Sequence, residues 1–269
     1  SDSGPTGRVG ALVGYDSQNQ QMLLFGGYDS QSGGERPFND LWSLPLTPGN
    51  ETWTMLKPGS SEPPARSSAS LAVDEAGRHL VLFGGVGTGE AYLQDTWSLD
   101  LTDGAYSWKR VSADGLPEKR AGASLVYIPP APDSAAHGRM IMFGGFSDKA
   151  YFNDLWSLDL EPGGEKWIRL AVEGTPPIKL YSHAAVFDAK ANRMIVFGGA
   201  QFIGSPGGGG QSRNNDRTWA LSLTPGSERW SELKPKGKPK WFSLLIAYDT
   251  CPGAESVYMY NEEEVWNLS

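Results

Sequence analysis

Three arginines stand at matching places in the chain, each after a link rich in glycine or proline: Arg8, Arg66 and Arg120. Leu180 and Trp241 occupy the corresponding places further along. A guanidinium group is a planar fork of N–H donors that pairs well with carboxylates, so these arginines could form a cationic collar for an anionic or polyhydroxyl ligand. The structural alternative is that each arginine binds backbone carbonyls or a neighbouring acid. The sequence leaves both interpretations open.

Aromatic residues accompany these positions. Trp241 replaces an arginine, and Tyr181 adjoins Leu180. Aromatic rings at the mouth of a pocket suit a sugar face, an aryl ring or a peptide side chain. The alternative is that Trp241 only fills space in the last part of the chain. The predicted ligand-binding set is completed by four residues in or beside connecting loops: Tyr28, Arg213, Tyr260 and Glu262.

Two clusters of opposite charge lie in the C-terminal part of the chain. Lysines occupy alternate positions from Lys234 to Lys240, directly before Trp241, and Glu262 to Glu264 form an acidic turn. Exposed charges of this kind are generally solvated and contribute little to stability. The functional alternative is a docking patch for a partner.

Patterns typical of catalysis or metal binding are few. The histidines His79, His137 and His183 share no ligand spacing, so a histidine-based metal site is unsupported. Cys251 is the only cysteine, which excludes an intrachain disulfide and a thiolate cluster. The sequence holds no Gly-x-Ser-x-Gly elbow, phosphate loop or zinc signature. We therefore predict no cofactor and no metal.

The elements that must position these residues form a repeat. Phe-Gly-Gly follows an apolar run four times, and an Asp and a Trp follow each Phe-Gly-Gly. Each unit predicts four short strands, a to d, because alternating apolar residues recur between turn residues. Strand b runs into Phe-Gly-Gly, strand c carries this first Trp, and strand d carries a second Trp. A degenerate fifth unit ends the chain. The strand c tryptophans lie at intervals of 47 to 63 residues: Trp42, Trp97, Trp156, Trp219 and Trp266.

The Gly doublet, the spaced tryptophans and the link before each arginine resemble the repeat of the kelch family over essentially the whole chain. The resemblance implies an all-β fold, a β-propeller of five kelch-type blades of four antiparallel strands. The last blade is expected to have three strands, since the sequence stops after its strand c. Residues 1–269 would then form a single domain. The alternative is a fragment that lacks one or two blades. The motif residues themselves are expected to be architectural.

Strand direction sorts the loops of such a propeller. The b–c and d–a connections share one face, and the a–b and c–d connections share the other. The b–c loops contain 11, 8, 7 and 15 residues in the first four blades and shorten to a tight turn in the fifth. In a closed ring, the long loops of blades 1 and 4 would stand on either side of the short b–c turn of blade 5. This arrangement predicts a cleft near blades 4, 5 and 1. The glycine run 207–210 in the blade 4 loop could instead be mobile.

Composition narrows the partner classes. The chain has 23 basic and 31 acidic residues, a net charge of −8, which disfavours nucleic acid and anionic lipid as partners. No apolar stretch is long enough to span a bilayer, and localisation is open. We expect a monomer that binds a small molecule, a carbohydrate or a peptide at the channel mouth.

The alternative function is a small-molecule enzyme of the isomerase, cyclase or lyase type. Kelch-type sialic acid mutarotases use acid/base groups around the channel, and carboxylates in the b–c connections could do similar work here. The candidates are Asp29, Glu35, Glu90, Asp148 and Glu262–Glu264.

Overall fold

A computed structural model of the chain describes most of its residues. It covers residues 4–29, 31, 36–59, 61–104, 106–131, 137–204, 210–224 and 226–235, and the backbone of 245–249, 256–260 and 265–267. The chain divides into two compact units. The first comprises residues 1–121, 127–140 and 157–168, and the second residues 122–126, 141–156 and 169–269. The single domain expected from the sequence stays a prediction.

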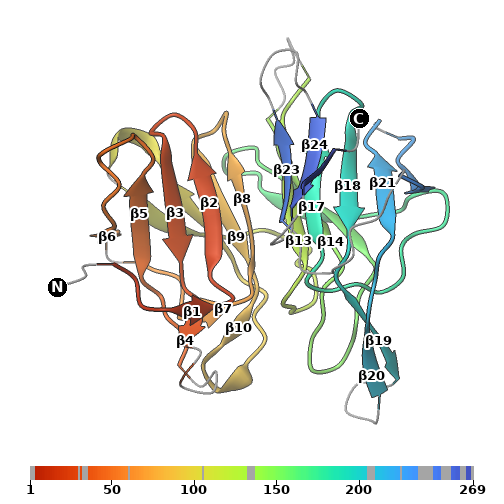
Figure 1. Cartoon of the computed structure of the whole chain (residues 1–269), viewed down its shortest axis with the longest axis horizontal. Helices are drawn as coiled ribbons and strands as arrows, with labels where there is room; N and C mark the ends of the chain where they lie inside the picture. Colours follow the sequence, from red (N-terminus) through yellow and green to blue (C-terminus); the bar gives the residue numbers. More distant parts are fainter. Residues whose placement is uncertain are drawn as a thin grey trace. The chain divides into compact units, whose positions relative to one another are not determined.

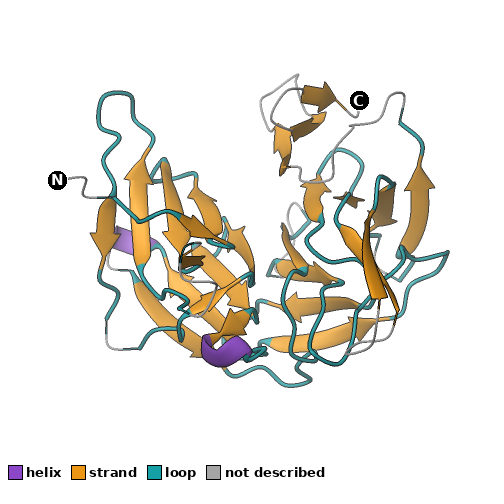
Figure 2. Ribbon diagram, turned by 60° about the horizontal axis from the view of Figure 1, so that its bottom comes forward, coloured by secondary structure: helices purple, strands orange, loops and turns teal. Residues whose placement is uncertain are grey.

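The fold is all-β, as predicted, and its helical content within the described residues is limited to two short 3-10 turns (Figure 2). Each of the first four repeat units forms an antiparallel sheet in the strand order a-b-c-d. Blade 1 contains β2 (Leu12–Asp16), β3 (Gln21–Phe25), β5 (Leu41–Pro45) and β6 (Thr54–Leu56). Blade 2 contains β8 (Ser70–Asp74), β9 (His79–Phe83), β11 (Thr96–Asp100) and β12 (Ser107–Val111).

Blades 3 and 4 repeat this order. Blade 3 contains β13 (Ser124–Ile128), β14 (Arg139–Phe143), β15 (Leu155–Asp159) and β16 (Lys166–Leu170). Blade 4 contains β17 (Ala184–Asp188), β18 (Arg193–Phe197), β21 (Thr218–Ser222) and β22 (Arg229–Leu233). The fifth sheet has three strands in its described part, β23 (Leu245–Asp249), β24 (Ser256–Tyr260) and β25 (Val265–Asn267). The number of blades in a closed ring stays a prediction.

Three smaller two-stranded sheets lie in the connections. β1 (Arg8–Val9) pairs with β4 (Tyr28–Asp29), and β7 (Arg66–Ser67) pairs with β10 (Val86–Gly87). In both cases a residue pair just before strand a meets the b–c loop of the same blade. β19 (Ala200–Gly204) and β20 (Gly210–Asn214) form a longer hairpin between strands b and c of blade 4 (Figure 1).

Tryptophan side chains pack successive sheets together, which agrees with the architectural role expected of the motif residues. Trp108 of strand d in blade 2 packs on Phe25 of the preceding Phe-Gly-Gly, with ring centroids 5.1 Å apart. Trp167 packs on Phe83 in the same way, at 5.1 Å. A buried indole removes a large apolar area from water and fixes the spacing of neighbouring sheets.

The first glycine of the doublet allows a close backbone approach in blades 1 to 3. Gly84 has φ +67°, and a Cβ atom there would lie 2.5 Å from the Arg120 carbonyl oxygen. The Gly85 N–H donates to the same carbonyl at 2.8 Å. An L side chain at residue 84 would therefore be strained and would separate strand b from the link that opens the next blade.

Candidate functional site

Arg66 lies in a buried clamp rather than on an open surface. Its two Nη atoms donate to the carboxylate of Asp95 at 2.7 and 2.8 Å, and Nη1 also donates to the Gly84 carbonyl at 2.9 Å. The Arg66 side chain has 0% exposure. Arg8 repeats the arrangement in blade 1, with Asp40 at 2.6 and 3.0 Å. Bidentate pairs of this kind give geometric precision as well as attraction.

The carboxylates of these clamps are held ionised. Burial alone would raise the pKa of Asp95, but the hydrogen bonds and charge of Arg66, with the Trp97 indole N–H, hold the pKa below its usual value. Arg8 and Trp42 act on the pKa of Asp40 in the same way. A carboxylate that stays ionised does not serve as a proton donor near neutral pH, so the clamps lend no support to the enzyme alternative.

The third predicted arginine, Arg120, is also buried, and its Nε donates to the Glu118 carbonyl at 3.0 Å. The structure thus places Arg8, Arg66 and Arg120 as the structural alternative requires, with their donors directed into the chain. A role for them in ligand binding stays a prediction.

Blade 4 departs from this pattern. Leu180 stands in place of the arginine and is fully buried. The Gly198 carbonyl, which matches Gly84, accepts a 2.9 Å hydrogen bond from the buried amide of Asn215 instead. One additional residue, Arg217, separates the Asn-Asp pair from strand c, and the Trp219 N–H has no partner among the described residues. The clamp chemistry of blades 1 and 2 is therefore absent here.

An aromatic cluster occupies the same edge of blade 4. Tyr181, one of the predicted site residues, packs on Phe146 and Tyr151 of the blade 3 b–c loop, with centroids 4.9 and 5.6 Å apart. Phe202 of β19 stacks on Tyr151 at 4.7 Å with only 5° between the ring planes. The sequence predicts Tyr181 as a site residue, but it does not predict the rings of Phe146, Tyr151 and Phe202 beside it.

The cluster fixes the β19–β20 hairpin in place. The backbone N–H of Tyr181 donates to the Ala200 carbonyl at 3.0 Å, and the Ala200 N–H donates back at 2.9 Å. The Tyr181 hydroxyl lies 2.7 Å from that of Ser212 on β20. Ser212 is opposite Phe202 in the hairpin register. One face of the hairpin is therefore attached to the body of blade 4.

The opposite face of the hairpin is exposed except at Gln201, which is half-buried. It carries Gln201 and Ile203 from β19, opposite Arg213 and Gln211 from β20, and we call these four residues the hairpin face. Ile203 is 47% exposed. Arg213 is exposed and has no ion-pair partner within the described part of the chain. A shallow depression is lined by Ile203, Gly210, Gln211 and Arg213.

The remaining predicted site residues are half-buried in a strand or lie wholly or partly outside the described part of the chain. Tyr28 is half-buried in β4, opposite Val9. Tyr260 ends β24, but its side chain lies outside the described part. Trp241 and Glu262, most of the lysine run and the proposed cleft over blade 5 also lie outside the described residues.

His183 is the one buried histidine of the described residues. Its Nε2 lies 2.9 Å from the Ser124 hydroxyl, and its ring packs against Phe143 at 5.3 Å. Burial lowers its pKa from 6.5 to about 4, so the ring is neutral. Among the residues described, no group of histidine, cysteine, aspartate or glutamate side chains could hold a metal ion.

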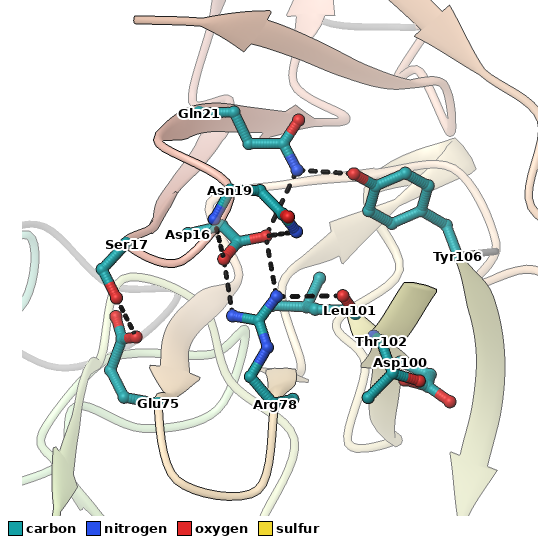
Figure 3. Close-up of polar contacts among 10 residues, drawn as sticks. All are labelled: Asp16, Ser17, Asn19, Gln21, Glu75, Arg78, Asp100, Leu101, Thr102 and Tyr106. Atoms are coloured by element: carbon teal, nitrogen blue, oxygen red, sulfur yellow. Dashed lines mark hydrogen bonds and ion pairs between the residues drawn. The ribbon is translucent and has the colours of Figure 1, made fainter. Parts of the chain in front are cut away.

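A separate polar cluster joins the a–b turns of blades 1 and 2 (Figure 3). Arg78 donates to the fully buried Asp16 at 2.6 Å and to the Leu101 carbonyl at 3.0 Å. Burial would raise the pKa of Asp16, but Arg78, Asn19 and Gln21 lower it to about 2. Every member has a partner inside the cluster, which indicates a structural fastening and no ligand site.

The sheets, Phe-Gly-Gly ends and arginine clamps together define a kelch-type β-propeller. The chain belongs to the Attractin/LZTR1 β-propeller family, whose model matches residues 22–248. Both the resemblance and the fold class predicted from the sequence are therefore confirmed.

Several curated proteins are similar to the chain. Adagio protein 3 of Arabidopsis thaliana is 27% identical over 260 residues, 93% of this chain and 38% of that protein. An F-box/kelch-repeat protein of the same plant is 29% identical over 249 residues, 87% of this chain and 46% of that protein. Multiple epidermal growth factor-like domains protein 8 of Homo sapiens is 32% identical over 217 residues, 77% of this chain and 7% of that protein. The chain thus spans less than half the length of these relatives.

Among solved structures, that of YjhT is similar in fold, with a TM-score of 0.64 and 16% identity, covering 97% of this chain and 84% of that one. At this identity the likeness concerns the fold alone. Within the described residues, no helix has the length and apolar character needed to cross a membrane.

Proposed function

We propose that this propeller is a recognition module that binds a protein partner through the hairpin face of blade 4. The observation that carries the proposal is the asymmetry of the β19–β20 hairpin. Its Phe202 and Ser212 side is fastened to Tyr151 and Tyr181, while Ile203 and Arg213 on the other side are exposed. A loop held on one side presents its other side without a large ordering cost on binding.

The chemistry of the hairpin face suits a peptide segment. Ile203 offers an apolar anchor, Gln201 and Gln211 offer amide donors and acceptors, and Arg213 offers a guanidinium fork. Arg213, which has no ion-pair partner among the described residues, is available to an acidic side chain, and arginine is enriched among residues that dominate binding energy. We therefore expect the partner to present a carboxylate beside an apolar side chain.

The similar proteins agree with a modular role. The matched region makes up 38% of Adagio protein 3 and 46% of the F-box/kelch-repeat protein. A propeller that forms one domain of a longer chain is suited to binding a partner on which the other domains act. The fold alone does not define a function, because one fold hosts many functions.

Selection from a random linear peptide library on the immobilised protein tests the proposal. We expect selected peptides to combine an acidic and an apolar residue. Binding measured by fluorescence anisotropy should weaken about ten-fold in Arg213→Glu and in Ile203→Ser, because both remove a dominant contact.

Matched controls exist on the strand d edges. Ile168 has the same 47% exposure as Ile203, and Arg169 is an exposed arginine beside it on β16. Ile168→Ser and Arg169→Glu should leave peptide affinity unchanged. Equal losses in the hairpin variants and the controls, or failure to select any peptide, would reject the hairpin face as the site.

A further inference from the structure

The β19–β20 hairpin has one bonded edge and one open edge. The outer edge of β19 is bonded at Ala200, whose N–H and C=O groups both pair with the backbone of Tyr181. The other strand, β20, lies on the opposite side of β19, and all of its residues from Gly210 to Asn214 are exposed. β20 is therefore an edge strand, and the hairpin that carries it projects from blade 4 (Figure 1).

The hydrogen-bond pattern of the hairpin shows which groups β20 presents at its open edge. In an antiparallel ladder, opposed residues alternate between pairs that exchange two backbone hydrogen bonds and pairs that exchange none. Ala200 directs both of its groups to Tyr181, so its pair with Asn214 is of the second kind. The Asn215 N–H donates to the Gly199 carbonyl at 2.9 Å, so the adjacent pair is of the first kind. These two pairs fix the alternation along the whole hairpin.

Ser212 and Asn214 direct their backbone groups away from β19. By the alternation, the backbone groups of Gln211 and Arg213 bond to β19, while the N–H and C=O groups of Ser212 and Asn214 face the open edge. Among the described residues, no backbone group outside the hairpin pairs with either of them. An exposed edge with unpaired N–H and C=O groups is a template for pairing with another strand.

We propose that a partner protein binds by adding an extended segment to β20 as an antiparallel strand. The inference rests on the function proposed above and adds the binding mode and the spacing of the partner's residues. Backbone groups of the segment would bond to Ser212 and Asn214, and side chains would provide the specificity. An acidic residue would lie opposite Arg213. An apolar residue would lie opposite Gln211, beside the depression that Ile203 also lines. The acidic residue therefore precedes the apolar one by two positions.

The charge of Arg213 favours an acidic partner over a second copy of this chain. Two β20 strands paired antiparallel about Ser212 would place Arg213 opposite Gln211, and each guanidinium would then lack a carboxylate. Opposite charges at directly opposed positions stabilise an antiparallel pair. A segment with an acidic residue at this position provides that pairing, and a second β20 strand does not.

The probe is a synthetic peptide with the central sequence Thr-Glu-Thr-Val-Thr, and NMR titration of the protein measures its affinity. In the proposed register, the central threonine lies opposite Ser212 and donates its N–H to the Ser212 carbonyl. N-methylation of this threonine should weaken binding about five-fold, which corresponds to one neutral hydrogen bond. N-methylation of the valine should leave affinity unchanged, because the valine N–H points away from β20.

Ser212→Pro tests the same bond from the side of the protein. It removes the outward N–H of β20 and leaves the ladder with β19 intact, because this N–H is not part of that ladder. It should weaken probe binding about five-fold relative to Ser212→Ala, the matched control, which equally lacks the hydroxyl that lies 2.7 Å from that of Tyr181. Equal amide exchange at Gln211 and Arg213 in both variants shows that the hairpin persists.

The outcomes separate strand addition from the function proposed above. Equal effects of N-methylation at the threonine and the valine, or absence of saturable probe binding, would overturn strand addition alone. The function proposed above fails separately, if Arg213→Glu and Ile203→Ser leave the affinity of library peptides unchanged. Sedimentation provides a further check. A wild-type dimer that Ser212→Pro abolishes would identify a second copy as the occupant of the edge and would overturn the inference.

Discussion

The edges of blades 2 and 4 come from the same repeat and are held by different chemistry. In blade 2, Arg66 binds Asp95 and the Gly84 carbonyl in a buried clamp. In blade 4, Leu180 fills the arginine's place and Asn215 binds the matching Gly198 carbonyl. The same backbone acceptor is thus satisfied by a charged pair in one blade and by a neutral amide in the other.

The difference shows how an insertion is accommodated. Blade 2 closes its b–c connection through the two-residue pairing of β7 and β10. Blade 4 inserts the β19–β20 hairpin, and the rings of Tyr151, Tyr181 and Phe202 support it. The regular clamp maintains the fold, and the blade that lacks it carries the hairpin face that we propose for recognition.

The largest expected effect comes from breaking the blade 2 clamp. Arg66→Leu leaves Asp95 as a partly buried charge without its guanidinium partner, and removing one partner of a buried pair costs about 3–5 kcal/mol. Urea unfolding followed by circular dichroism measures the change in the free energy of unfolding.

In blade 4, the substitution that corresponds to Arg66→Leu is Asn215→Ala. It leaves the Gly198 carbonyl without a donor and should cost about 1–3 kcal/mol, less than the charged clamp. Adding Asp95→Asn to Arg66→Leu should recover part of the loss, because no buried charge then remains. A loss in Asn215→Ala equal to that in Arg66→Leu would contradict the distinction between the two edges.

The next largest effect is expected in the dependence of stability on pH, through the buried His183 beside blade 4. His183 stands where blade 2 has Ala69, and its folded pKa of about 4 lies below the ordinary 6.5. The unfolded chain therefore binds a proton first as the pH falls. The stabilisation is complete above about pH 6.5 and is lost progressively towards pH 4, by roughly 3 kcal/mol.

The variant His183→Gln isolates the contribution of His183 to the pH dependence of stability. Its free energy of unfolding should vary less between pH 6.5 and 4 than that of the wild type. The Asp16–Arg78 cluster contributes in a lower window, since the pKa of Asp16 is about 2 against an ordinary 3.8. An unchanged pH profile in His183→Gln would mean that the histidine is not buried as a neutral ring.

Sequence reasoning anticipated the parts of the molecule that repeat. The strands, the Phe-Gly-Gly ends and the structural option for Arg8 and Arg66 follow from local patterns seen several times over. The β19–β20 hairpin was not predicted. Its two strands, which contain Phe202 and Arg213, are separated by the glycine run 207–210, and such a run is typical of a loop. The Asp16–Arg78 pair was missed because it joins turns 62 residues apart that share no motif.

The smallest expected effect on global stability lies in the hairpin support. Phe202→Ala removes the ring that stacks on Tyr151, and such a pair contributes about 0.5–1.5 kcal/mol beyond its buried area. Because the hairpin projects from the sheet, we expect the loss to appear mainly as local opening. Amide hydrogen exchange should accelerate in β19 and β20 while the amides of β17, β18 and β21 keep their protection.

Ile203→Ala on the opposite face of β19 is the matched control and should leave hydrogen exchange in the hairpin unchanged. If both variants accelerated exchange equally, the rings of blade 4 would not be what holds the hairpin. If Phe202→Ala instead lowered the protection of β17 and β18 as well, the aromatic cluster would belong to the core of the blade. The contrast with blade 2 would then be one of packing and not of recognition.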